Sequence, residues 1–118
     1  MTIENLVGEY SIIGSNQDSD NNEYRGVLKL NLKNNLIIAK WLINDEQEQN
    51  GTGFFHENIL VINFNYIGND LKNYKGTVVY KCLTKNILDG FWSEEHGNPL
   101  YIGSERCFKI NKTDEILN

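Results

Sequence analysis

The feature that most constrains the fold is a period-two alternation of apolar and polar residues. In residues 24–33 one set of alternating positions holds only apolar residues or Gly, namely Tyr24, Gly26, Leu28, Leu30 and Leu32. The intervening positions are mostly polar, from Arg25 to Lys33. Successive side chains of a strand point to opposite faces, so this pattern predicts a half-buried β-strand.

Eight segments carry a strand pattern, and short runs rich in Asn, Asp and Gly separate them. They are residues 6–12, 24–33, 36–43, 51–55, 59–66, 74–82, 87–93 and 101–110. No segment longer than about ten residues has helical periodicity, which excludes a plan of parallel strands with crossover helices. Closing an antiparallel meander removes its edge strands. We therefore predict an all-β fold, an eight-stranded antiparallel up-and-down barrel.

The length bounds the domain organisation. The chain has 118 residues, of which 40% are hydrophobic, and this suits one globular domain with one core. We expect a single barrel domain over residues 1–111 and a flexible C-terminal tail over residues 112–118. An eight-stranded barrel has an interior that side chains just fill or that holds one small ligand.

The two halves of the chain share a pattern. Tyr24-Arg25-Gly26 and Tyr74-Lys75-Gly76 are separated by 50 positions, and so are Gly53 and Gly103. Trp41 and Trp92, which close the segments beginning at Leu36 and Ile87, are separated by 51. Regular offsets are the mark of internal repeats, and two copies are too few for a solenoid. The barrel is therefore compatible with a duplicated four-strand half; chance matching in a strand-rich sequence is the alternative.

The charge and the N-terminus narrow the classes of partner and compartment. A formal charge of −5 without a basic patch argues against nucleic acid and against an anionic membrane surface. The first residues lack the basic and apolar regions of a signal peptide, so we expect a cytoplasmic protein with Cys82 and Cys107 as free thiols. No cofactor-binding motif is present, and we expect no cofactor.

Two groups of residues resemble patterns of known proteins. Gly8-Glu9-Tyr10 on the first strand, followed by eight short strands, resembles the calycin-like barrels of the avidin and lipocalin type, with Tyr10 in place of their Trp. The resemblance implies a small, mostly apolar ligand inside the barrel, and Arg106 as the basic residue stacked on the ring. Leu88, Gly90, Trp92, Gly103 and Glu105 are also similar to a Leu-x-Gly-x-Trp and Gly-x-Glu pattern of uncharacterised bacterial proteins.

Aromatic residues gather at the inward positions. A buried Tyr hydroxyl needs a hydrogen-bond partner. Either these residues fill the core and their hydroxyls bond one another and trapped water, or they line a pocket whose ligand supplies the partner. We predict a non-catalytic module that binds a small apolar or aromatic molecule. Its expected ligand-binding residues are Tyr10, Tyr24, Trp41, Tyr74, Tyr80 and Trp92.

The last strand is predicted with Phe108 and Ile110 inward and with Glu105 and Cys107 outward. Cys82 falls on the inward parity, so the two thiols are not expected to converge. His56, His96 and the cysteines lack the paired spacings of a zinc site, and Asp18 to Asn22 fail the EF-hand pattern, so we expect no metal site.

Apolar residues on the outer parity predict a partner. Exposed together on neighbouring strands they would form a patch too large for a monomer. We expect a homodimer or a protein partner of immunity or inhibitor type, and this interaction function is the alternative to ligand binding. The expected interface residues are Ile38, Leu42, Ile59, Val61 and Val79.

An enzyme is the third hypothesis. Glu94, Glu95 and His96 combine carboxylates with an imidazole that can transfer protons. No nucleophile or oxyanion-stabilising group accompanies them in the sequence, and a charged surface loop explains them as well. We therefore expect no catalytic residues.

Overall fold

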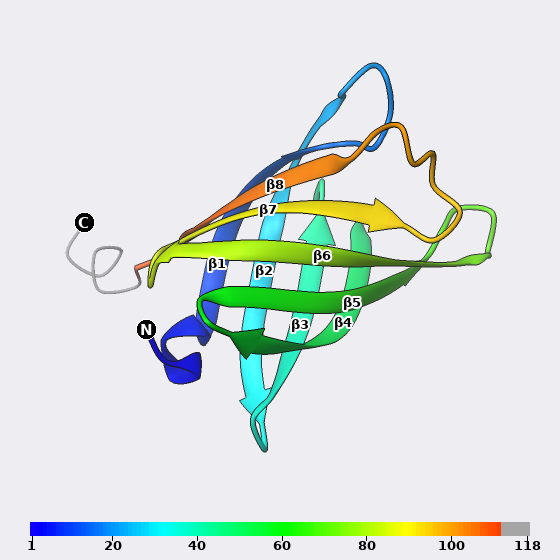
Figure 1. Cartoon of the computed structure of the whole chain (residues 1–118). Helices are drawn as coiled ribbons and strands as arrows, with labels where there is room; N and C mark the ends of the chain where they lie inside the picture. The colour runs from blue at the N-terminus through cyan, green and yellow to red at the C-terminus, as the bar shows by residue number, and fades with distance from the viewer. Residues whose placement is uncertain (112–118) are drawn as a thin grey trace.

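A computed structural model describes residues 1–111, and its eight strands close into one antiparallel barrel (Figure 1). Each strand pairs with its sequence neighbours, and β8 completes the barrel by pairing with β1. The predicted up-and-down barrel is confirmed. The expected tail, residues 112–118, lies outside the described residues. The strands are β1 (Gly8–Ser15), β2 (Glu23–Lys33), β3 (Leu36–Ile43), β4 (Gln47–His56), β5 (Ile59–Ile67), β6 (Asn73–Thr84), β7 (Ile87–Glu94) and β8 (Gly103–Lys109).

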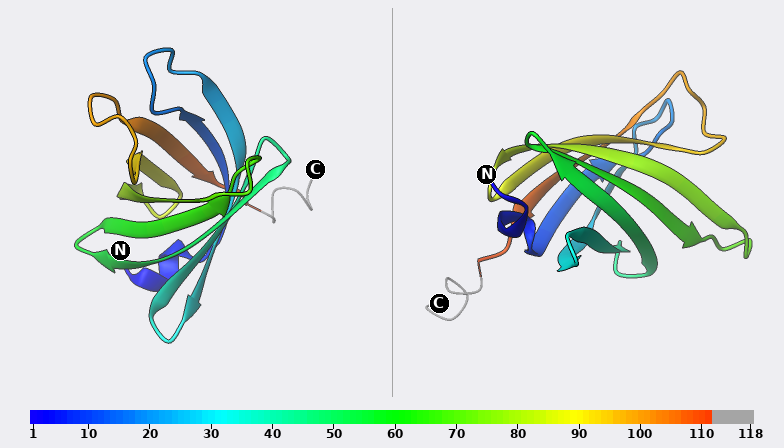
Figure 2. Two further views of the ribbon diagram at one scale, coloured as in Figure 1. Left: turned by 90° about the vertical axis from the view of Figure 1, so that its right-hand side faces the viewer. Right: turned by 60° about the horizontal axis from the view of Figure 1, so that its bottom comes forward.

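The two ends of the barrel have different connections. At one end, β2–β3, β4–β5 and β6–β7 are joined by two-residue turns that each contain Asn. Both residues of the first two turns have positive φ, for example Asn34 at 52° and Asn35 at 67°, as tight hairpins require. At the other end, residues 16–22, 44–46, 68–72 and 95–102 form longer loops around the barrel mouth (Figure 2).

The end with the tight turns is covered by a short 3₁₀ helix, η1 (Ile3–Leu6). Leu6 is fully buried, and the Tyr10 hydroxyl donates a hydrogen bond of 2.7 Å to its carbonyl oxygen. The Lys109 ammonium lies 5.5 Å from the centre of the Tyr10 ring and donates to the carbonyl oxygen of Asn5. These contacts hold η1 across this end and close it.

Lys109 therefore has the position that we expected for Arg106. Arg106 points out of the barrel, where its Nε lies 3.4 Å from Asp89 Oδ1 on β7. The expectation was wrong because it followed from the predicted register of the last strand. Lys109 reaches the Tyr10 ring from the last residue of β8, where its aliphatic stem packs along Gly8.

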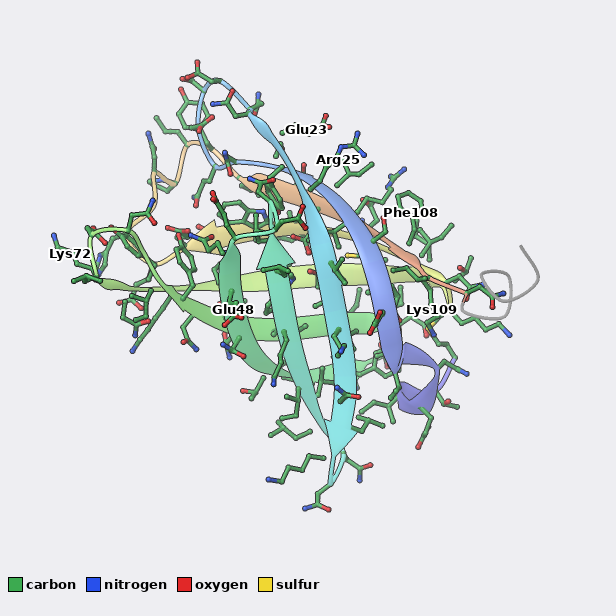
Figure 3. The ribbon with its side chains drawn as sticks, turned by 180° about the vertical axis from the view of Figure 1, so that it is seen from behind. Glu23, Arg25, Glu48, Lys72, Phe108 and Lys109 are labelled. Atoms are coloured by element: carbon green, nitrogen blue, oxygen red, sulfur yellow. The ribbon has the colours of Figure 1, made fainter. Side chains whose placement is uncertain are left out.

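The register of β8 is the reverse of the prediction. Glu105 and Cys107 point inward, and Cys107 lies between Ile12 on β1 and Leu88 on β7. Phe108 points outward with 39% of its surface exposed (Figure 3), and Ile110 lies beyond the end of the strand. The prediction failed because it assigned the apolar residues to the interior, whereas this interior also holds a charged residue with its hydrogen-bond partners.

Both thiols are consequently buried inside the barrel. Cys82 and Cys107 each pair with Leu88, one from either side, and neither forms a disulfide. The expectation that the thiols face opposite sides of the sheet was wrong for the same reason as the register. Burial raises the pKa of Cys82 to about 11 and the pKa of Cys107 above its ordinary value.

β4 begins four residues earlier than the sequence suggested. Residues 47–50 were expected in a loop because they carry no apolar stripe. Instead Gln47 and Gln49 are half-buried on the inward face of β4, opposite Ile43 and Trp41. Polar side chains are suitable here because this part of the interior opens to solvent.

The core fills the closed half of the barrel. Its buried side chains come from η1 and every strand except β4, which adds the partly buried Phe55. Most of them were predicted inward by the alternation, with Glu105 and Cys107 added and Phe108 and Ile110 removed. The most deeply buried members are Leu6, Tyr10, Ile12, Leu28, Leu30, Ile37, Leu60, Ile62, Tyr80, Leu88 and Cys107.

The two halves correspond strand for strand over part of their length. Trp41 pairs with Leu28, and Trp92 pairs with Val78; both partners lie four residues after the Tyr of the shared pattern. The correspondence ends at the fourth strand, since Gly53 pairs with Ile37 but Gly103 pairs with Trp92. A duplicated origin stays a prediction.

Candidate functional site

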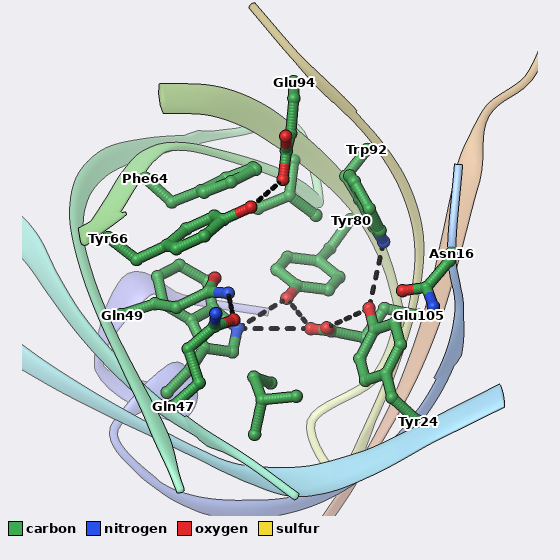
Figure 4. A pocket seen from close by; sticks show the side chains of 13 residues that line it. Asn16, Tyr24, Gln47, Gln49, Phe64, Tyr66, Tyr80, Trp92, Glu94 and Glu105 are labelled. Carbon is green, nitrogen blue, oxygen red and sulfur yellow. Dashed lines mark hydrogen bonds between the residues drawn. The ribbon is translucent and has the colours of Figure 1, made fainter. Parts of the chain in front are cut away.

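A cavity occupies the half of the barrel toward the long loops (Figure 4). It has a volume of about 90 Å³ and is partly open to solvent. The side chains around it are mainly aromatic rings, carboxylates and amides. They are Asn16, Tyr24, Trp41, Ile43, Gln47, Gln49, Phe64, Tyr66, Val78, Tyr80, Trp92, Glu94 and Glu105.

Glycines create the space for the rings. Four aromatic residues that line the cavity each face a Gly on the adjacent strand, which allows the ring to lie against the neighbouring backbone. A Cβ on Gly103 would lie 2.0 Å from the Trp92 ring, and a Cβ on Gly14 would lie 2.3 Å from the Tyr24 ring. The pairs are Gly14 with Tyr24, Gly76 with Phe64, Gly90 with Tyr80 and Gly103 with Trp92.

Glu105 forms the floor of the cavity. Only 4% of its surface is exposed, and donors from three other strands converge on its carboxylate. Tyr24 donates to Oε1 at 2.7 Å, and Trp41 Nε1 donates to Oε2 at 3.2 Å. The Tyr80 hydroxyl also donates to Oε2, and the Cys107 thiol lies 3.7 Å from the same oxygen.

The indole groups orient this network. An indole N–H can only donate, and Trp92 Nε1 donates to the Tyr24 hydroxyl oxygen at 2.9 Å while Trp41 Nε1 also reaches the Tyr80 oxygen at 3.4 Å. Both hydroxyl hydrogens are therefore directed at Glu105. This arrangement offers donors alone to the carboxyl group, which suits its ionised form.

Burial and hydrogen bonding oppose each other at Glu105. Loss of solvent raises the pKa of Glu105 above its ordinary value, and the hydrogen bonds from Tyr80, Tyr24 and Trp41 act to lower it. The pKa values of Tyr24 and Tyr80 are raised, first by burial and then by the nearby carboxylate. Both tyrosines are consequently neutral hydrogen-bond donors at physiological pH.

The wall of the cavity is a group of rings at different angles. The Phe64 ring centre lies 6.1 Å from that of Trp41 and 6.2 Å from that of Trp92, both nearly edge to face. Tyr66 stacks on Phe64 at 6.5 Å, and its hydroxyl donates to Glu94 (Figure 4). Burial and then this hydrogen bond raise the pKa of Tyr66.

The structure brings together four of the six predicted ligand-binding residues, since Tyr24, Trp41, Tyr80 and Trp92 all line the cavity. Tyr10 lies in the closed half, where it is fully buried against η1. Tyr74 lies at the rim, stacked on Tyr66 at 5.3 Å, and its hydroxyl donates to Asp70. Neither of these two tyrosines contacts the cavity.

Sequence reasoning did not identify the polar members of the site. Glu105 was assigned to the outside, Gln47 and Gln49 to a loop, and Glu94 only to a catalytic hypothesis. One signal was present: Gly103, Glu105 and Cys107 alternate, and Gly103 belongs to the repeated pattern. Gly103 pairs with the inward Trp92, and residues of the same parity on β8, including Glu105, therefore also point inward.

The residues of the enzyme hypothesis do not converge. Glu94 lines the cavity, whereas the side chain of His96 is 90% exposed and lies 3.3 Å from Glu95. Within residues 1–111, no group of three His, Cys, Asp or Glu side chains is placed to hold a metal ion. Over the same residues, no helix has the length and apolar character needed to span a bilayer.

The predicted interface residues are distributed over the outer surface. Val61 and Val79 pair across β5 and β6, and the same row continues to Phe54 on β4 and Phe91 on β7. The sequence reasoning omitted both phenylalanines, which are 58% and 47% exposed. Of the other predicted residues, Ile38 lies opposite Asn31 and Thr52, Leu42 opposite Val27 and Glu48, and Ile59 opposite His56 and Lys81.

The comparisons with known proteins support the barrel fold and identify no family. The sequence matches no protein-family model and no curated protein. The barrel is similar to a redesigned β-barrel, b11L5F_LGL, with a TM-score of 0.75 and 10% identity over 92% of this chain and 94% of that one. It is similar to the redesigned barrel mFAP0 bound to DFHBI, with a TM-score of 0.68 and 15% identity over 89% and 99%. A third similar structure, EF1p2_mFAP2b bound to DFHBI, has a TM-score of 0.69 and 13% identity over 91% and 95%.

Proposed function

We propose that this protein is a non-catalytic binding module that takes up a small apolar or aromatic molecule in the open half of its barrel. The observation that carries the proposal is the division of the interior. One half is filled by the core, while the other holds a cavity of about 90 Å³ whose wall is built from aromatic rings. Concave sites with apolar walls and a few fixed polar groups are typical of small-molecule binding.

Two further observations support this proposal. The rings are held by glycines on adjacent strands and the floor by the Glu105 hydrogen bonds, so the site is formed before any ligand arrives. Barrels of similar fold were solved with DFHBI bound, although their sequences are at most 15% identical to this one. This likeness supports the view that a barrel of this architecture can hold a small aromatic molecule. It does not identify the natural ligand.

The test uses the intrinsic fluorescence of the protein. Trp41 and Trp92 are the two tryptophans of the sequence and both line the cavity, so a bound ligand should change their emission. We expect members of a panel of small neutral and cationic aromatic molecules to quench this emission and to raise Tm. If no member of the panel has either effect, the proposal is wrong.

A matched pair of variants locates the binding. Val78 points into the cavity and Val79 points to the outer face, so Val78→Phe should fill the site while Val79→Phe leaves it empty. We expect Val78→Phe alone to abolish the ligand response. Binding that persists in Val78→Phe, or is lost equally in both variants, would place the ligand elsewhere.

The outer apolar row supports the second candidate function, a protein–protein interaction. Phe54, Val61, Val79 and Phe91 lie side by side across four strands, and we propose that they contact a second copy or a protein partner. Val61→Lys should then abolish a dimer measured by sedimentation or a complex measured by co-purification. A dimer or complex unchanged by this substitution would refute the interaction.

A further inference from the structure

We propose that the cavity selects organic cations, and that it surrounds an ammonium head group with aromatic rings and with the carboxylates of Glu94 and Glu105. This inference rests on the proposed function, because it names the class of ligand for the same cavity. It is carried by three properties of the lining: its charge, its remaining hydrogen-bonding capacity and the arrangement of its rings.

The charge of the lining has one sign. Among the residues that the structure describes, the side chains around the cavity include Glu94 and Glu105 but no Lys, Arg or His. The whole chain also carries a formal charge of −5. Charges interact strongly in a partly enclosed site of low dielectric constant. The cavity therefore attracts a cation and disfavours an anion.

The donors of the cavity are already engaged. The hydroxyls of Tyr24 and Tyr80 donate to Glu105, and the Tyr66 hydroxyl donates to Glu94. Trp41 Nε1 donates to Glu105, and Trp92 Nε1 donates to Tyr24. A ligand therefore meets mainly acceptor oxygens and ring faces, which match an ammonium group better than they match a carbonyl or a carboxylate.

The amides at the mouth can both donate and accept hydrogen bonds. The Gln49 side-chain nitrogen donates to the Gln47 side-chain oxygen at 2.8 Å. This bond links two residues of β4 that line the cavity, and it occupies one N–H of Gln49. Asn16 and Gln47 also carry amide nitrogens at the mouth, so the engaged donors are those of the floor and the wall, where the head group would lie.

The rings surround a volume and do not form a single flat stack. Phe64 meets Trp41 at an interplanar angle of 68° and Trp92 at 86°, so their faces point in different directions. A cation is attracted to a ring face when it lies within about 6 Å of the centroid, most strongly when it is desolvated. Several rings at such angles can contact one compact cation together.

The volume suits a head group and not a whole large ligand. The cavity of about 90 Å³ is smaller than the roughly 150 Å³ of an engineered cavity that takes up benzene. A trimethylammonium head group has about the bulk of that ring, and because the cavity is partly open the remainder of the ligand can stay outside it. The head would lie among the rings between Glu105 and Glu94, and the rest of the molecule would lie in the mouth beside Asn16.

The test compares two probes of the same shape. Phenyltrimethylammonium and tert-butylbenzene differ in a single central atom, nitrogen or carbon, and thus in charge. Tryptophan emission is titrated with each at mildly alkaline pH, which favours ionisation of Glu105. We expect the cation to bind at least about tenfold more tightly than its neutral isostere, and benzenesulfonate, an anionic aromatic probe, to produce no response.

Three variants connect the preference to the carboxylates. Glu94→Gln and Glu105→Gln remove the two charges of the cavity, and each should reduce the affinity for phenyltrimethylammonium severalfold while leaving tert-butylbenzene almost unaffected. Glu95→Gln is the control, because Glu95 carries the same charge beside Glu94 but does not line this cavity. It should change neither affinity.

The outcomes separate this inference from the proposed function. If tert-butylbenzene binds as tightly as the cation, or if benzenesulfonate binds best, the cavity is a ligand site but not a cation site. A preference for the cation that Glu95→Gln weakens as much as the other two variants would also overturn the inference. If neither of the isosteric probes nor benzenesulfonate changes the emission or Tm, the site takes none of these compounds and the proposed function loses its support together with the inference.

Discussion

Replacing Glu105 by Leu removes the acceptor at the centre of the buried network. Within the described residues, the Tyr80 hydroxyl is then left with the Cys107 sulfur, a weak acceptor, and a buried donor without a good partner costs about 1–3 kcal/mol. Tyr24 and Trp41 keep only their longer bonds, 3.3 Å to Ser104 O and 3.4 Å to the Tyr80 oxygen. We expect Glu105→Leu to reduce the free energy of unfolding by about 2–4 kcal/mol.

Glu105→Gln is the matched control. The amide oxygen can accept from Tyr80 and Trp41, and the amide nitrogen can donate to Tyr24 once that hydroxyl turns to Ser104 O. We expect this variant to lose only about 1 kcal/mol. Urea unfolding followed by far-ultraviolet circular dichroism measures both values. Glu105→Leu within about 0.5 kcal/mol of the parent would refute the account of the network.

The pH dependence of stability in the parent and in Glu105→Gln gives an independent check. Burial raises the pKa of Glu105 in the folded protein above its value of 4.5 in the unfolded chain. At a pH between the unfolded and the folded pKa, the folded state therefore holds a proton that the unfolded state has lost. The contribution of Glu105 is therefore fully present below about pH 4.5 and falls as pH rises through its folded pKa. Glu105→Gln lacks this titration, so the parent should lose stability relative to the variant over that range. If the parent instead gained stability relative to Glu105→Gln as pH rises, the hydrogen bonds would outweigh burial.

Three further predictions concern other parts of the barrel. Gly103→Ala forces a Cβ to within 2.0 Å of Trp92, and we expect a loss of about 1–3 kcal/mol in unfolding free energy and an altered tryptophan emission spectrum. Tyr10→Phe removes the bond to the η1 carbonyl and should cost about 1 kcal/mol in urea unfolding while leaving ligand titrations unchanged. Cys82 and Cys107 should resist iodoacetamide in the native protein and react only in denaturant, as measured by mass spectrometry; rapid native labelling would contradict their burial.

The alternation of apolar residues was sufficient to predict the strands and the closed barrel. Leu28, Leu30, Leu60 and Ile62 face inward as their parity requires, and the two-residue turns of β2–β3 and β4–β5 help to fix the register of these hairpins. The same reasoning placed the cavity aromatics Tyr24 and Tyr80 inside. For these positions, hydrophobic burial and strand geometry favour the same arrangement.

The floor of the site was not predictable in this way. An inward Glu105 violates the hydrophobic pattern, and it is stable only because donors from β2, β3 and β6 meet there. Such convergence depends on which strands lie across the barrel from β8, and this information is not local in sequence. The apolar side chain of Phe108, which points outward, also favoured the wrong register for β8.

The unequal ends of the barrel differ in how much change they tolerate. Lengthening a loop has a small entropic cost, about 0.6 kcal/mol for each doubling, whereas a two-residue hairpin tolerates few changes. The long loops at the mouth can therefore change in sequence or length with little effect on the core. They are residues 16–22, 44–46, 68–72 and 95–102. Exchanging these loops would reshape the entrance to the cavity, whose lining comes from the strands except for Asn16, while the hairpins and η1 at the opposite rim stay constant.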